Sequence, residues 1–85
     1  MIEQAIITYC DEELSRSVEV YIPLVDVLDS LDVLEVIVWI ERNYQINIDP
    51  GDILPDNFGT VHQIASYIRS KTADGHNFTS KLANP

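Results

Sequence analysis

The segment from Asp29 to Tyr44 constrains the fold of this chain most strongly, because a helix-start signal is followed there by sustained helical periodicity. Asp29 is a good N-cap: its carboxylate can accept hydrogen bonds from free N–H groups of the first turn, and it suits the positive end of the helix dipole. Asp32 follows at an acidic variant of the capping-box spacing. The sequence therefore predicts a helix over 30–44, with the Ser30 hydroxyl pointing outward at its rigid start.

Apolar residues fall on two different sides of this predicted helix. One set continues the expected core and consists of Val33, Val36, Ile37, Ile40 and Tyr44. The other set shares the side of Ser30 and consists of Leu31, Leu34 and Val38. A core helix needs one apolar face, so a second face beside Glu35 and Glu41 favours a transient docking surface. The alternative is that the loop over 15–28 folds across this second face and buries it.

Two further helices are expected to pack against the central one. Apolar residues at helical spacing predict the first helix over 2–14, and Thr60 is a fair N-cap for a last helix through about Ser70. A short helical turn is expected around 53–54 or 57–58, between or just after turn signatures at 49–52 and 55–57. The predicted core of these helices contains Ile6, Val61, Ile64 and Ile68.

The connection over 15–28 admits two interpretations. Val18, Val20 and Ile22 alternate with more polar neighbours, as in a short strand. Pro23 interrupts that pattern, and no partner strand is evident elsewhere in the sequence. An ordered loop packed by its own apolar side chains is therefore preferred.

The chain length of 85 residues predicts one small domain. We place this domain at residues 1–71 and expect a mobile tail over 72–85, where the sequence is polar and unpatterned. No stretch approaches a membrane span, and the first residues do not resemble a secretion signal. Cys10 is the only cysteine, which excludes a disulfide framework and predicts a small buried thiol in a reducing, cytoplasmic setting.

The net charge of −9 is unevenly distributed. All of the 14 acidic residues except Asp74 lie in 1–68, where Arg16 and Arg42 are the only bases. Such a surface repels phosphate backbones, so nucleic-acid binding is not expected. It attracts basic patches on partner proteins, although acidity can also serve solubility alone.

No constellation for autonomous catalysis is apparent. Asp26, Asp29, Asp32 and Glu35 recur every three residues, but the glycine and terminal acid of a loop calcium site are missing, so a divalent-ion protein is only a minor alternative. No phosphate loop, nucleophile elbow or zinc spacing is present. Ser30 has no base beside it in sequence, and it is therefore interpreted as a serine presented to another enzyme. We expect no catalytic residue, no metal ligand and no enzyme activity.

The chain resembles the acyl carrier proteins, a family of small acidic domains that includes peptidyl and aminoacyl carriers. The resemblance covers about residues 2–70 and is carried first by Asp29, Ser30 and Leu31 at the head of the central helix. It continues through Asp32, Leu34, Glu35, Ile37, Ile40, Glu41, Tyr44, Ile46, Ile48, Phe58, Thr60, Val61, Ile64, Tyr67 and Ile68. The family implies an all-α fold, a small four-helix bundle with three main helices, one short helix and a long first loop.

The resemblance also implies a function. Ser30 falls where the family attaches 4′-phosphopantetheine from coenzyme A, and Asp29 falls where an aspartate precedes the modified serine. The arm's thiol holds an acyl or aminoacyl group as a thioester and moves it between enzymes, while the carrier catalyses nothing. The implied partners are a phosphopantetheinyl transferase, a loading ligase and downstream enzymes with basic docking patches. Partner recognition falls on Leu31, Leu34, Glu35, Val38 and Glu41.

Several positions depart from the common family pattern. Val27 replaces a frequent glycine, Arg42 replaces a usual acid, and the run over 54–58 is closer to stand-alone carriers of specialised pathways. We therefore expect a cytoplasmic, monomeric carrier of a specialised biosynthetic pathway. The alternative is an unmodified acidic adaptor that uses the same helical surface without an arm.

Overall fold

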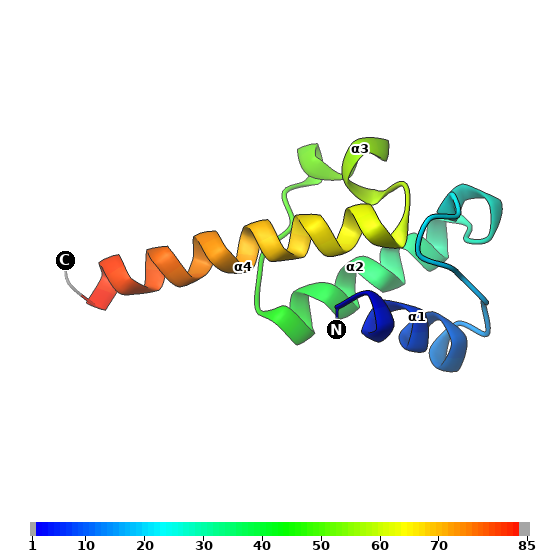
Figure 1. The fold of residues 1–85 in the computed structure, drawn as a ribbon, viewed down its shortest axis with the longest axis horizontal. Helices are drawn as coiled ribbons and strands as arrows, with labels where there is room; N and C mark the ends of the chain where they lie inside the picture. Colours follow the sequence, from blue (N-terminus) through cyan, green and yellow to red (C-terminus); the bar gives the residue numbers. More distant parts are fainter. Residues whose placement is uncertain (1, 84–85) are drawn as a thin grey trace.

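Helices and helical turns form all of the regular secondary structure in residues 2–83, whose backbone the computed structural model describes; side chains are described for residues 2–72. In chain order the elements are α1 (Ile2–Glu13), η1 (Leu24–Asp26), α2 (Ser30–Tyr44), η2 (Pro50–Asp52), α3 (Pro55–Phe58) and α4 (Val61–Ala83), where η marks a 3₁₀ turn. The expected all-α bundle with three main helices, one short helix and a long first loop is confirmed (Figure 1). No helix in the described part of the chain is both long and apolar enough to span a bilayer.

The core lies where α1, α2 and the first half of α4 meet. Ile6, Ile40, Ile64 and Ile68 are each at most 1% exposed, and Val61, the first residue of α4, is fully buried. The predicted core residues of the first and last helices are therefore confirmed. Burial of such branched side chains is the main source of stability in a domain of this size.

An ion pair joins α1 to α4 beside this core. The Arg69 guanidinium donates to both oxygens of Glu3, with N···O distances of 2.9 and 2.7 Å. These hydrogen bonds lower the pKa of Glu3 to about 2. The pair bridges residues 66 positions apart in the sequence, so it forms only when the two helices are packed.

The loop between α1 and α2 is ordered by its own apolar side chains, as the sequence predicted. Val18, Leu24 and Leu28 are buried. The loop backbone also bonds to the α3–α4 region, since Leu24 N donates to Gly59 O at 2.8 Å and His62 N donates to Val20 O at 2.9 Å. The strand considered for 18–22 does not form, and no strand occurs anywhere in residues 2–83.

The connection from α2 to α4 contains the short helix α3. Of the two places expected for it, 53–54 and 57–58, the second is correct. Gln45 ends α2 with a left-handed backbone, φ 53°, and η2 occupies the turn expected at 49–52. The prediction of a second turn at 55–57 is wrong, because Pro55 takes the first position of α3, where its missing N–H costs nothing. Gly59 then allows the close turn into α4: an added Cβ would lie 2.5 Å from Pro55 O.

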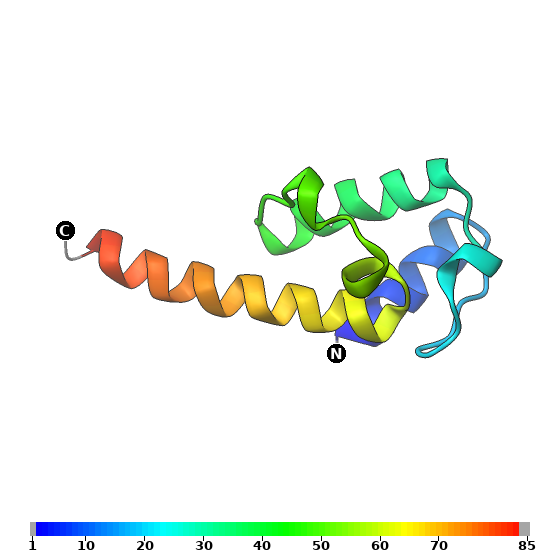
Figure 2. The same ribbon diagram turned by 90° about the horizontal axis from the view of Figure 1, so that it is seen from above.

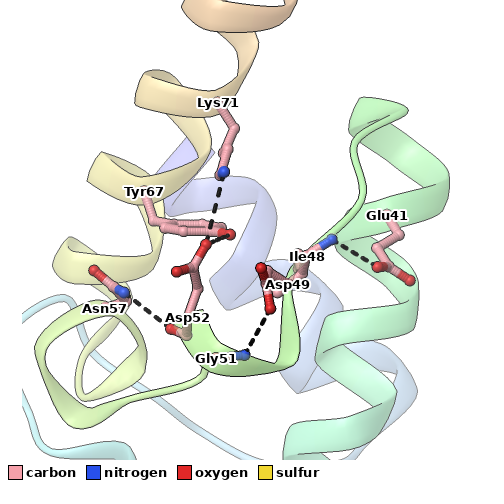
Figure 3. A network of polar contacts seen from close by, with 8 residues as sticks. All are labelled: Glu41, Ile48, Asp49, Gly51, Asp52, Asn57, Tyr67 and Lys71. Atoms are coloured by element: carbon pink, nitrogen blue, oxygen red, sulfur yellow. Dashed lines mark hydrogen bonds and ion pairs between the residues drawn. The ribbon is translucent and has the colours of Figure 1, made fainter.

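Polar contacts hold this connection against α2 and α4 (Figure 3). Asp52 Oδ2 accepts a hydrogen bond from Tyr67 Oη at 2.8 Å and lies 3.6 Å from Lys71 Nζ, while its carbonyl accepts from Asn57. Burial and the hydrogen bond to Asp52 raise the pKa of Tyr67 to about 12. On the α2 side, Glu41 Oε2 accepts from Ile48 N at 2.8 Å.

The last helix is longer than the sequence predicted. Thr60 does cap it, because its Oγ1 accepts from Gln63 N at 3.1 Å. The end expected near Ser70 is wrong: α4 continues through Ala83 and extends past the other helices (Figures 1 and 2). Polar composition does not by itself stop a helix, and no proline interrupts this segment before Pro85. Most of the tail predicted over 72–85 belongs to residues whose side chains are not described. The domain boundary at residue 71 therefore stays a prediction.

Candidate functional site

Ser30 is the first residue of α2, and its side chain is exposed. No hydrogen bond to its Oγ occurs among the residues whose side chains are described. The exposed hydroxyl at a rigid helix start is therefore present as the sequence predicted. The positive end of the α2 dipole lies at this residue, which is a favourable place for a negatively charged phosphodiester.

A capping box fixes the backbone immediately before Ser30. Asp29 Oδ1 accepts from Asp32 N at 2.8 Å, and Asp32 Oδ2 accepts from Asp29 N at 3.3 Å. Asp29 itself has the extended backbone of an N-cap, with φ −90° and ψ −178°. The predicted cap and its reciprocal partner are both confirmed. Together they fix the backbone from which the Ser30 side chain projects.

Arg16 secures this cap from the first loop. Its Nε lies 3.1 Å from Asp32 Oδ2, the same oxygen that accepts from Asp29 N. Arg16 N in turn donates to Cys10 O at 2.9 Å, so the end of α1, the loop and the start of α2 are connected. Sequence reasoning missed this contact, because 16 residues separate the two partners and no local spacing links them.

The second apolar face of α2 remains uncovered. The exposed fractions of Leu31, Leu34 and Val38 are 67%, 57% and 46%, and Glu35 beside them is also exposed. The loop over 15–28 does not bury this face, which was the alternative considered. We call Leu31, Leu34, Glu35 and Val38 the α2 outer face.

Glu41 differs from the other residues expected to contact partners. It is half-buried, and one of its carboxylate oxygens holds the backbone after α2 through Ile48 N (Figure 3). This contact gives Glu41 a role within the fold. Its participation in partner binding stays a prediction.

The inner face of α2 packs as expected. Val36, Ile37 and Ile40 are buried, while Val33 and Tyr44 are half-buried against the same core. Trp39, whose role periodicity left open, stacks on Tyr9 of α1, with ring centroids 4.8 Å apart and planes inclined by 23°.

The remaining reactive groups do not gather around Ser30. Cys10 is fully buried, and burial raises its pKa to about 11, which keeps the thiol protonated near neutral pH. His62 lies on α4 against Tyr21 of the loop, with ring centroids 5.1 Å apart. In the described residues no group of three histidine, cysteine or acidic side chains is arranged to hold a metal ion.

Comparison with known proteins identifies this architecture. The sequence model of the phosphopantetheine attachment site family matches residues 23–68, more than half of the chain and the part that contains the capped start of α2. The chain belongs to this family. The resemblance to acyl carrier proteins and the covalent 4′-phosphopantetheine cofactor predicted from the sequence are thereby confirmed for the carrier domain.

Two curated relatives agree with this assignment. The acyl carrier protein of Onion yellows phytoplasma (strain OY-M) is 47% identical over 45 residues, which cover 53% of this chain and 57% of that protein. The acyl carrier protein of Aster yellows witches'-broom phytoplasma (strain AYWB) is 46% identical over 46 residues, which cover 54% and 58%. The carrier domain thus spans little more than half the length of these relatives. No solved structure gives a significant match.

Proposed function

We propose that this chain is a non-catalytic carrier whose Ser30 Oγ holds 4′-phosphopantetheine. The arm's thiol supplies the thioester bond to an acyl or aminoacyl group, which the carrier moves between partner enzymes. The observation that carries this proposal is the exposed Ser30 hydroxyl at the capped start of α2, within the residues that match the family.

The residues around Ser30 fit this role without performing chemistry. Asp29 orients the helix start through Asp32 N, and Asp32 is itself engaged by Arg16. The carboxylates nearest to Ser30 in sequence are thus occupied in holding the backbone. Because no base contacts the hydroxyl in the described residues, we assign its activation to a phosphopantetheinyl transferase.

The partner enzymes are proposed to dock on the α2 outer face and Glu41. Exposed leucines next to acidic side chains fit a transient interface with basic, partly apolar patches. The transferase, an acyl- or aminoacyl-loading ligase and downstream biosynthetic enzymes would share this surface in turn. The run over 54–58, together with the departures at Val27 and Arg42, supports a specialised pathway, and we propose that the carrier works as a cytoplasmic monomer.

Intact-mass measurement tests the attachment site. Incubation with coenzyme A, magnesium and a broad-specificity phosphopantetheinyl transferase should add the mass of one arm to the wild-type chain. Ser30→Ala should gain nothing, whereas Ser66→Ala, which removes another exposed serine on α4, should gain one arm. No gain by the wild type, or a gain that survives Ser30→Ala, would contradict the proposal. A Ser30→Ala chain that supports its pathway as well as wild type would favour the unmodified adaptor.

A further inference from the structure

A groove of about 660 Å³ runs along α1 at its contact with α2. The stacked rings of Tyr9 and Trp39 form an aromatic wall. Ala5 and Thr8 line the groove beside them. Its lining also includes Glu12, toward the carboxyl end of α1. The groove therefore combines aromatic surface with negative charge.

The charge at this end of α1 opposes the stability of the helix itself. Asp11, Glu12 and Glu13 follow one another at its carboxyl end, and no basic residue lies in its last turn. Carboxylates there add to the negative end of the helix dipole, an arrangement that costs stability. Arg16, the nearest base that follows in sequence, pairs with Asp32 instead. Local rules are commonly broken in this way where a protein binds something.

We propose that this groove is a docking site for an arginine-bearing segment of a partner protein. A guanidinium group is planar and can stack on the part of the half-buried Tyr9 and Trp39 rings that lines the groove. Its N–H groups can at the same time donate to the carboxylates of Glu12 and Glu13. An arginine satisfies both features of the groove, whereas an apolar or acidic segment would leave the two carboxylates unpaired.

The groove lies apart from the face that presents Ser30. At about 100° per residue, Trp39 is roughly half a turn around α2 from Ser30 and a third of a turn from Leu34 and Val38. It is only about 40° from Glu35, whose backbone carbonyl accepts a hydrogen bond from Tyr9 Oη at 3.4 Å. A partner held in the groove therefore leaves Ser30, Leu34 and Val38 accessible to a second enzyme, while it borders the α2 outer face at Glu35. This biological role rests on the proposed carrier function, but binding in the groove does not require the arm.

Fluorescence of Trp39, the only tryptophan, reports directly on occupation of the groove. We expect titration of the unmodified protein with a capped hexa-arginine peptide to change this emission saturably. The double variant Glu12→Gln/Glu13→Gln should raise the Kd roughly fivefold, as expected for loss of two exposed ion pairs. The control Glu19→Gln/Asp26→Asn removes the same charge from exposed sites outside the groove and should change the Kd less than about twofold.

Two further measurements separate docking from general attraction. Because the Glu12→Gln/Glu13→Gln variant relieves the helix dipole, its Tm should be at least that of wild type, so weaker binding cannot come from unfolding. A capped hexa-lysine peptide should bind more weakly than hexa-arginine, since an ammonium group lacks the planar stacking surface.

The proposal is overturned by equal weakening in both double variants, by equal affinity for the two peptides, or by no response of Trp39. It is also overturned if sedimentation shows that a second copy of the chain occupies the groove. Failure of the mass test at Ser30 would leave these binding results unaffected, so the two proposals fail separately.

Discussion

Ser30 gains its geometry from neighbouring side chains. Asp29 and Asp32 bond reciprocally to each other's backbone N–H groups, and Arg16 holds Asp32 from the loop. These polar contacts position the Ser30 hydroxyl, although none of them involves the hydroxyl itself. Exposure and rigidity are both needed if a separate enzyme is to recognise one serine among several.

At the scale of single residues, the contribution of the Asp29 cap to stability can be distinguished from that of its negative charge. Asp29→Ala should lower the free energy of unfolding by about 1 kcal/mol, because the first turn of α2 loses its side-chain acceptor. Asp29→Asn should retain most of that stability, since asparagine caps equally well. Urea unfolding followed by circular dichroism measures both. Equal losses in the two variants would assign the stabilisation to charge and not to the cap.

Cys10 provides a second test with single residues. Its thiol is buried and its pKa is raised to about 11, so it should react slowly with a thiol reagent at pH 7 until the chain unfolds. The chain has no other cysteine. A folded, arm-bearing protein should therefore show one fast-reacting thiol, and the unmodified protein none. Fast reaction of the unmodified protein would mean that α1 opens readily.

At the scale of elements, α2 carries two apolar faces with opposite surroundings. Ile40 is fully buried in the core, whereas Leu34 is 57% exposed. The first face contributes to stability and the second is available to partners. Trp39 and Tyr9 stack where α2 meets α1, beside the inner face.

Substitutions on the two faces of α2 should have opposite effects. Ile40→Ala should lower the free energy of unfolding by about 2–5 kcal/mol through lost burial and a cavity. Leu34→Asp should keep the helical circular-dichroism signal and most of the stability, yet lower kcat/KM for arm addition by the transferase. Chemical denaturation and transferase kinetics measure these effects. A severe loss of stability in Leu34→Asp would show that the outer face is packed in solution.

At the scale of the whole molecule, long-range contacts join helices that are distant in sequence. Arg69 on α4 holds Glu3 on α1, while Tyr67 and Lys71 hold Asp52 of the connection. These pairs flank the core on two sides of α4. The long helix is thereby fixed to the first helix and to the short segment before it.

The pair between Glu3 and Arg69 predicts a specific pH dependence. The pKa of Glu3 is lowered from 4.5 to about 2 in the folded protein, so the unfolded chain binds the proton more readily. This contribution to stability is present above about pH 4.5 and is lost as the pH falls towards 2. Glu3→Gln should therefore flatten the fall of Tm over this interval, relative to wild type. If Glu3→Gln leaves the fall of Tm at acid pH unchanged, other carboxylates control that fall.

Several features followed from local sequence. The cap at Asp29, the two faces of α2, and the buried positions of Ile6 and Ile64 each follow from spacing and side-chain chemistry over a few residues. The exposed Ser30 belongs to the same class, because a helix start and its cap are local structures. The family assignment depends on this same contiguous pattern, and the match over 23–68 supports it.

Other features depend on contacts between distant segments. Arg16 reaches Asp32 across the loop, Trp39 stacks on Tyr9 of another helix, and the half-buried Glu41 accepts a hydrogen bond from Ile48 N. None of these partners is specified by helical spacing, because each requires two segments to meet after folding. The last helix is also longer than the local sequence predicts, since no stop signal lies near Ser70 and the next proline is Pro85.

Local chemistry alone thus established where α2 begins and ends, which of its faces are apolar and which hydroxyl is presented. Packing then decided whether the outer face of α2 stayed open, which acids became structural ligands and where the groove on α1 formed. The physical reason is range: capping and periodicity act within a few residues, whereas burial and ion pairing depend on the distances that the assembled bundle imposes.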